Sequence, residues 1–322
     1  MRPLGAVLGI WLCTAVSAFA QDAERMPIVG VMRINTAANN EPFATLFRDA
    51  LAARGYVEGR DLRLDYRFAD GDAQRYSEMA QALVRDRVGV IVVFSDPAAR
   101  AAQRETQTIP IIAVLGDPVA SGLITSLAKP GGNLTGISMF GSELAAKRLE
   151  LLTEILPAAQ RVGVLIDRAN VPPERLREVE DGARALGVAL QTVGVHSPAD
   201  FAVAFDTLRA GGTEAVTILG SSMVFNYRHE VGALALANKL PAMCDLPEMA
   251  AAGSLASYGP SWRELSGNLA ELTGQILKGA SPADTPVRQP TRFELVINLK
   301  VARAIGVKIP PAMLDRADEV IE

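Results

Sequence analysis

The feature that most constrains this chain is a repeated alternation of short apolar runs with longer amphipathic stretches. Runs such as Val88–Ser95 and Pro110–Leu115 are rich in β-branched residues and free of charge, which predicts strands buried on both faces. Stretches such as Glu41–Arg54 and Glu143–Leu156 carry apolar residues at helical spacing, which predicts amphipathic helices between the strands. This alternation predicts an α/β fold whose parallel sheets are covered by helices on both faces.

The alternation continues along the whole chain in two successive series. Further strands are expected at Ile28–Ile34, Leu62–Phe68, Gly136–Phe140, Val162–Asp167, Leu190–Val195, Ala215–Leu219, Pro241–Cys244, Leu255–Tyr258 and Phe293–Asn298. Further helices are expected at Ala73–Arg87, Pro97–Arg104, Pro173–Leu186, Tyr227–Ala237, Trp262–Leu277 and Leu299–Ile305, with one more opening at the capping box Ser197–Asp200. The length of 322 residues leaves room for roughly two domains of ~150 residues each.

No linker or low-complexity segment separates the two series, so we expect two similar Rossmann-like lobes joined by more than one chain crossing. We assign residues 27–139 and 259–285 to lobe 1, and residues 140–258 and 286–322 to lobe 2. A ligand cleft between the lobes is expected from this arrangement.

The first twenty residues have the layout of a secretory signal peptide. Arg2 supplies the positive start, Leu4–Val16 is an apolar core of thirteen residues, and Ala18 and Ala20 are the small residues of a cleavage site. The apolar core is shorter than the ~20 residues of a membrane-spanning helix. We expect residues 1–20 to be removed on export and the mature protein to be periplasmic.

Composition excludes several classes of function. The chain has 32 Lys and Arg against 36 Asp and Glu, which gives a net charge of −4. This negative charge argues against binding to the phosphates of nucleic acid. The two cysteines and two histidines form no metal-binding cluster, so no metal or other cofactor is expected. No G-x-G-x-x-G, phosphate loop or G-x-S-x-G elbow occurs, and we expect no enzyme activity. A secreted hydrolase with two paired carboxylates is the remaining enzyme alternative.

Open parallel sheets bind ligands beyond the carboxyl ends of their strands, so polar residues that follow the predicted strands are candidate ligand-binding residues. This set, to which the aromatic side chains of Phe225 and Tyr258 are added, is Asn35, Thr36, Ser95, Asp96, Asp117, Ser138, Asn170, Ser221, Phe225, Asp245 and Tyr258. Asp96-Pro97 and Asp117-Pro118 also have the pattern of a helix N-cap followed by proline, and a capping role is compatible with ligand binding there.

Several long segments resemble one bacterial family. These segments are Arg54–Gly71, Gly116–Ser138, Ala145–Pro157, Pro290–Gly306 and Pro310–Glu322. They are similar to the tryptophan/tyrosine-type substrate-binding proteins of ABC transporters, and the match covers essentially all of the chain after the signal peptide.

The resemblance implies the type I periplasmic binding protein fold and a ligand bound between two hinged lobes, which close and dock on a permease in the inner membrane. By position, it assigns Ser95, Asp117 and Ser138 to the ligand from lobe 1, and Asn170, Ser221 and Asp245 from lobe 2. The expected ligand is a small polar molecule such as an amino acid, and the family includes members that bind aromatic amino acids. We expect a monomer. The alternative is a sensory protein that docks on a receptor instead of a permease.

Overall fold

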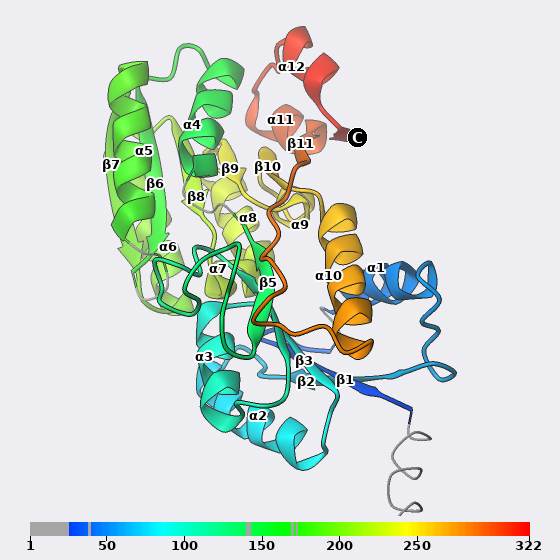
Figure 1. The fold of residues 1–322 in the computed structure, drawn as a ribbon. Coiled ribbons are helices and arrows are strands. Elements are labelled where there is room, and N and C mark those ends of the chain that lie inside the picture. Colours follow the sequence, from blue (N-terminus) through cyan, green and yellow to red (C-terminus); the bar gives the residue numbers. More distant parts are fainter. Residues whose placement is uncertain (1–25, 38–39, 140–142, 169–170, 172) are drawn as a thin grey trace, which may run out of the picture.

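The computed structural model describes residues 26–37, 40–139, 143–168, 171 and 173–322. The chain forms two α/β lobes, one below the other in Figure 1. The predicted signal peptide and Asn170 lie outside the described residues. Within the described residues, no helix combines the length and the apolar character needed to cross a bilayer.

Lobe 1 is built on a five-stranded sheet in the order β2-β1-β3-β4-β5, and every pair in it is parallel. The strands are β1 (Ile28–Arg33), β2 (Arg63–Phe68), β3 (Val90–Val93), β4 (Ile111–Leu115) and β5 (Leu134–Ser138). Strands β3 and β4 are buried along their whole length, as their uninterrupted apolar runs predict, and the edge strand β5 is buried as well.

Helices cover both faces of this sheet. They are α1 (Glu41–Ala52), the short η1 (Ala73–Arg75), α2 (Tyr76–Arg85), α3 (Asp96–Glu105) and α10 (Trp262–Leu277). One apolar core joins α1 and α10 to one face, and a second core joins α2 and α3 to the other. Because α10 comes from far along the sequence, lobe 1 is complete only after the chain has built most of lobe 2 (Figure 1).

Lobe 2 is built on a seven-stranded sheet in the order β12-β11-β10-β9-β8-β6-β7. Its strands are β6 (Arg161–Asp167), β7 (Ala189–Val195), β8 (Ala215–Leu219), β9 (Ala242–Cys244), β10 (Ala256–Pro260), β11 (Phe293–Asn298) and β12 (Glu319–Ile321). The expectation of wholly parallel sheets is wrong for one pair, because β11 runs antiparallel to β10. The chain leaves lobe 2 at the end of β10 and re-enters at the start of β11, so the two strands must run in opposite directions.

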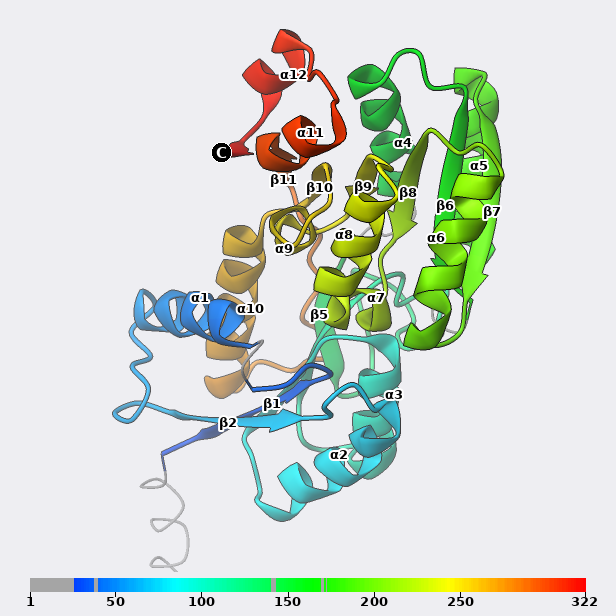
Figure 2. The ribbon, with the colours of Figure 1, turned by 180° about the vertical axis from the view of Figure 1, so that it is seen from behind.

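The helices of lobe 2 are α4 (Glu143–Ile155), α5 (Pro173–Leu186), η2 (Pro198–Asp200), α6 (Phe201–Ala210), α7 (Ser222–Asn226), α8 (Arg228–Ala237), α9 (Pro247–Ala251), α11 (Leu299–Ile305) and α12 (Pro311–Arg316). One core packs α4, α5, α11 and α12 on one face of the sheet (Figure 1), and another packs α6, α8 and α9 on the opposite face, which Figure 2 shows. The predicted capping box is present at Ser197 and Asp200. The sequence did not predict α7, α9, α12 or β12, all of which are short.

In the first strand of each lobe, a glycine is covered by a leucine side chain from a helix. Gly30 in β1 lies under the side chain of Leu83, and a Cβ atom there would come within 2.7 Å of it. Gly163 in β6 lies in the same way under Leu208, at 2.6 Å. In each lobe the glycine lets a helical leucine settle directly on the strand.

The chain passes between the two sheets at three places (Figure 1). It leaves lobe 1 after β5, returns between β10 and α10, and enters lobe 2 again between Arg288 and β11. Arg288 still hydrogen-bonds across β5, because its N–H donates to Gly136 and its carbonyl accepts from Ser138. The domain boundaries stated above stay a prediction.

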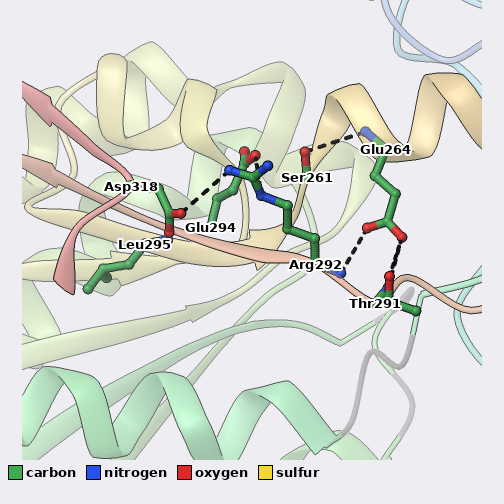
Figure 3. Close-up of polar contacts among 7 residues, drawn as sticks. All are labelled: Ser261, Glu264, Thr291, Arg292, Glu294, Leu295 and Asp318. Atoms are coloured by element: carbon green, nitrogen blue, oxygen red, sulfur yellow. Dashed lines mark hydrogen bonds and ion pairs between the residues drawn. The ribbon is translucent and has the colours of Figure 1, made fainter.

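Two of these crossings are fastened together by Glu264, in the first turn of α10 (Figure 3). Its carboxylate accepts hydrogen bonds from the backbone N–H of Thr291 at 3.0 Å, the hydroxyl of Thr291 at 2.7 Å and the backbone N–H of Arg292 at 2.8 Å. Ser261, on the other crossing, donates its N–H to the carbonyl of Arg292 and caps α10 through its hydroxyl. These hydrogen bonds therefore join the two crossings directly.

The same segment is tied to the C-terminal end of lobe 2. Asp318 accepts the N–H of Leu295 at 2.9 Å, and the guanidinium of Arg292 lies 3.8 Å from carboxylate oxygens of Asp318 and Glu294 (Figure 3). The residues that precede β12 thus hold β11 at the point where it enters the sheet.

Candidate ligand site

The carboxyl ends of the two sheets face each other. Strand β5 ends where the chain crosses to lobe 2, and its neighbours in the sheet are parallel to it, so this end of the lobe 1 sheet faces lobe 2. Strand β10 ends where the chain crosses to lobe 1, and β9, β8 and β6 run parallel to it. The residues that follow these strands therefore lie between the lobes, where parallel sheets bind ligands.

The side of lobe 1 that faces lobe 2, at the carboxyl ends of its strands, is the edge of lobe 1. It is lined by aromatic rings and contains a buried cation. The guanidinium of Arg33, at the end of β1, lies 4.5 Å from the ring centroid of Phe43 and 4.1 Å from that of Phe94. These rings meet edge to face at 4.7 Å, and Phe43 also meets the ring of Trp262 at 6.1 Å. Burial lowers the pKa of Arg33 to about 10, so the guanidinium stays charged at neutral pH while contacting the ring faces.

The predicted lobe 1 residues take different positions at this edge. Asn35 is buried directly after β1, whereas Thr36 is exposed. The hydroxyl of Ser138 donates to the carbonyl of Gly116 at 2.9 Å and joins the ends of β5 and β4.

The two Asp-Pro pairs are not the helix caps that their sequence predicts. Ser95 caps α3, because its hydroxyl accepts from the N–H of Ala98, and Asp96 is the first helical residue. Burial raises the pKa of Asp96, and the backbone N–H of Gly116 and the charge of Arg100 oppose that shift. Asp117 is exposed and begins a turn instead of a helix, with one carboxylate oxygen accepting from Val119 and Ala120 at 3.1 and 3.0 Å.

The edge of lobe 2 carries charges instead of rings. Asp245 follows β9, and two arginines reach the same strand ends from the helices on one face. Arg148 of α4 donates through Nε to the carbonyl of Tyr258 in β10 at 2.7 Å. Arg175 of α5 donates through Nη1 to the carbonyl of Gly220, which follows β8, at 3.1 Å.

The remaining predicted lobe 2 residues that the structure describes make contacts within lobe 2 itself. Ser221 caps α7 by accepting from the N–H of Val224 at 3.2 Å. The ring of Phe225 lies 4.9 Å from the guanidinium of Arg228. The ring of Tyr258 packs on Phe293 at 6.0 Å, so the backbone of Tyr258 reaches the charged edge and its ring reaches the core.

One side-chain hydrogen bond spans the lobes at these edges. Nε1 of Trp262, on α10 of lobe 1, donates to a carboxylate oxygen of Glu248, on α9 of lobe 2, at 3.0 Å. Burial raises the pKa of Glu248, and the bond from Trp262 and the charges of Arg228 and Arg33 oppose that shift. The aromatic edge of lobe 1 thus meets an acidic group from lobe 2.

Sequence reasoning missed the buried charges Arg33 and Arg148 and the half-buried charges Arg175 and Glu248. A signal was present for two of them. Arg33 interrupts the apolar run Ile28–Ile34, and Arg148 lies on the apolar stripe of its helix beside Leu149 and Leu152. A charged residue at an otherwise apolar position marks a buried group that needs a partner. Within the described residues, no three or more His, Cys, Asp or Glu side chains gather in a metal-binding arrangement.

Two α/β lobes with facing strand ends and three crossings define a two-lobed binding protein of the type I periplasmic binding protein fold. The profile of the ABC transporter substrate-binding protein family matches residues 41–321. The chain therefore belongs to that family, and it is a substrate-binding protein.

Two similar proteins have names that state a ligand. A tyrosine-binding protein of Clostridioides difficile is 27% identical over 289 residues, which cover 89% of this chain and 83% of that protein. A structure from Streptococcus pneumoniae in complex with L-tryptophan is 26% identical, with a TM-score of 0.83 over 92% of this chain and all of that one.

A ligand-free, open substrate-binding protein from Clostridium difficile is also 26% identical and covers 92% of this chain and 99% of its own. Its TM-score is only 0.69, against 0.83 for the tryptophan complex at the same identity and coverage. The lobes of this chain are therefore arranged more like those of the complex than those of the open protein.

Proposed function

We propose that this protein captures an amino acid with an aromatic side chain between its two lobes and delivers it to an ABC permease. The observation that carries this proposal is the aromatic edge of lobe 1, where Phe43 and Phe94 contact the buried guanidinium of Arg33 and Trp262 packs on Phe43, opposite the charged edge of lobe 2. Aromatic rings recognise another ring by edge-to-face or stacked contact. The tyrosine-binding relative and the tryptophan complex support the same ligand class.

The proposed ligand-binding residues lie at or near the ends of the facing strands, with the aromatic residues Phe225 and Tyr258 added. In lobe 1 they are Asn35, Thr36, Ser95, Asp96, Asp117 and Ser138, and in lobe 2 they are Asn170, Ser221, Phe225, Asp245 and Tyr258. The protein works without catalysis and as a monomer in this proposal. Its lobes close on the ligand and present the closed form to the permease.

Thermal-shift screening of residues 21–322 tests the ligand class. The panel contains the common amino acids, with glucose and ribose derivatives as ligands of another class. A ligand at a hundred times its dissociation constant adds ~2.7 kcal/mol to the stability of the folded state, which raises the melting temperature by several degrees. We expect the largest shifts with tryptophan, tyrosine and phenylalanine. Shifts with sugars alone would reject the proposed ligand class.

Export and delivery have tests of their own. Members of this family are typically extracytoplasmic, and we propose the periplasm for this chain on the strength of its N-terminal pattern. N-terminal sequencing of the periplasmic protein should begin at Gln21. Deleting the gene should reduce uptake of the radiolabelled amino acid if the partner is a permease, whereas unchanged uptake would favour a sensory role.

A further inference from the structure

The edge of lobe 2 holds three charged side chains, each with a buried polar atom that has no hydrogen-bond partner within the protein. Arg148 is only 2% exposed, and its Nη1 atom has no hydrogen-bond partner, although Nε bonds to Tyr258. In Arg175 the unsatisfied atom is Nε, and in Asp245 it is Oδ1. The two arginines are otherwise held in place, because Arg148 donates to the carbonyl of Tyr258 and Arg175 to that of Gly220.

These charges lie close together without forming an ion pair. No nitrogen of Arg148 or Arg175 comes within ion-pair distance of the Asp245 carboxylate, yet the charge of Asp245 is the main electrostatic influence on both guanidiniums. A buried charge without a partner is strongly destabilising, so a retained cluster of this kind needs an explanation. Groups brought by a ligand would supply the missing partners.

The backbone is arranged to let the carboxylate reach this position. A Cβ atom built on Gly220 would lie 1.9 Å from Oδ2 of Asp245, so any larger residue there would displace the carboxylate. Gly220 also gives its carbonyl to Arg175. Gly220 thus leaves room for the Asp245 carboxylate and also accepts the hydrogen bond of Arg175, so the acidic and basic groups lie close to each other.

We propose that Arg148 binds the carboxylate and Asp245 the ammonium of a free α-amino acid, with Arg175 strengthening the positive side. This inference rests on the proposed function and names the groups of the ligand that the lobe 2 edge recognises. The two charges of an α-amino acid sit on one carbon atom, and therefore require opposite charges side by side. The ligand side chain then points to the aromatic edge of lobe 1.

The charge balance selects this ligand class over others. The negative charge of Glu178, on the same helix, also stabilises the charged form of Arg175. The cluster formed by Arg148, Arg175, Asp245 and Glu178 therefore has two positive and two negative charges and is neutral in sum. A zwitterion satisfies both signs and adds no net charge. A sugar leaves both charges unneutralised, and a polyanion is repelled by Asp245.

Ligand analogues that lack one of the two charges test these residue assignments on the unaltered protein. Calorimetric titration would compare L-tryptophan and L-tyrosine with L-tryptophanamide and tryptamine, which lack the carboxylate, and with indole-3-propionate, which lacks the ammonium. Because each analogue loses charge-assisted hydrogen bonds, we expect affinity to fall by about 10- to 150-fold. Analogues that bind as tightly as tryptophan would overturn the inference.

Two variants link each charge to its residue. In R148M, tryptophan and its amide should bind with equal affinity, because the carboxylate has lost its partner. In D245N, tryptophan and indole-3-propionate should become equal. The matched control is R184M, which removes an exposed arginine of α5 that forms an ion pair with Asp181. Full discrimination against the amide in R148M, or against indole-3-propionate in D245N, would contradict the assignment of that residue.

The outcomes separate this inference from the proposed function. If the unaltered protein binds no amino acid, the proposed function fails and the inference fails with it. If it binds tryptophan or tyrosine but accepts the analogues that lack one charge equally well, only the inference fails. The analogue series does not depend on any variant, so a variant that does not fold leaves the test intact.

Discussion

The two facing edges bury the same kind of group in opposite surroundings. In lobe 1, Arg33 lies against the rings of Phe43 and Phe94, whereas in lobe 2 Arg148 bonds to a backbone carbonyl and lies near Asp245. Burial lowers the pKa of both guanidiniums to about 10. The two edges therefore differ in their chemistry: aromatic rings lie against the guanidinium of lobe 1, and a carboxylate lies near that of lobe 2. In the proposed function, the first edge binds the side chain of the ligand and the second binds its charged groups.

The largest expected effect tests whether the two lobes are built alike beneath these edges. Leu83→Ala and Leu208→Ala each remove a fully buried leucine that rests on a strand glycine. Each should lower the free energy of unfolding by about 3–5 kcal/mol, through lost burial and the cavity left behind. Urea denaturation would measure both, with Trp262 fluorescence reporting on lobe 1. A loss of less than about 1 kcal/mol of unfolding free energy in either lobe would show that the two leucines do not have equivalent structural roles.

The second test compares the glycines that follow a central strand in each lobe. A Cβ on Gly220 would collide with the Asp245 carboxylate, whereas a Cβ on Gly116 would meet open space. Gly220→Ala should therefore weaken tryptophan binding by about 1–3 kcal/mol, the usual cost of overpacking, and Gly116→Ala should leave it unchanged. Calorimetric titration would measure both affinities. Equal affinities in the two variants would mean that the position of Asp245 does not matter.

A third test addresses the hydrogen bond that joins the edges. Trp262→Phe keeps a ring beside Phe43 but removes the donor to Glu248. Because a hydrogen bond to a charged group contributes about 1.5 kcal/mol or more, the ligand-free lobes should shift towards the open arrangement. Small-angle X-ray scattering should show a larger radius of gyration than in the unaltered protein. An unchanged radius, with normal ligand binding, would show that this bond does not hold the lobes together.

The smallest effect concerns the hinge that both lobes share. Burial alone would raise the pKa of Glu264, but the hydrogen bonds from Thr291 and Arg292 outweigh it and lower the pKa below its usual value. The carboxylate therefore contributes stability above its unfolded pKa of about 4.3, and this contribution is lost as pH falls through the lower folded pKa.

Glu264→Gln should therefore cost about 1 kcal/mol of unfolding free energy at pH 7 and almost nothing near pH 3. Urea denaturation at both pH values would measure it, with the exposed Glu230→Gln as the control. An equal cost at both pH values would show that the ionised carboxylate is not what fastens the crossings.

The sequence determined the architecture because hydrophobic periodicity is local. The buried runs that became β4 and β8, and the amphipathic stretches that became α5 and α10, are visible without any knowledge of the fold. The strand-end rule also made Asp245 a candidate ligand-binding residue, because recognising a polar residue directly after a buried strand needs only local information, and its role in binding stays a prediction.

Tertiary structure decided what lies beside those strand ends. Arg148, which lies near Asp245, comes almost a hundred residues earlier in the chain, and the aromatic edge of lobe 1 includes Trp262, which follows the return of the chain from lobe 2. The reversed strand β11 likewise follows from where the chain re-enters its sheet. These features depend on contacts between distant segments, and periodicity within one segment carries no information about them.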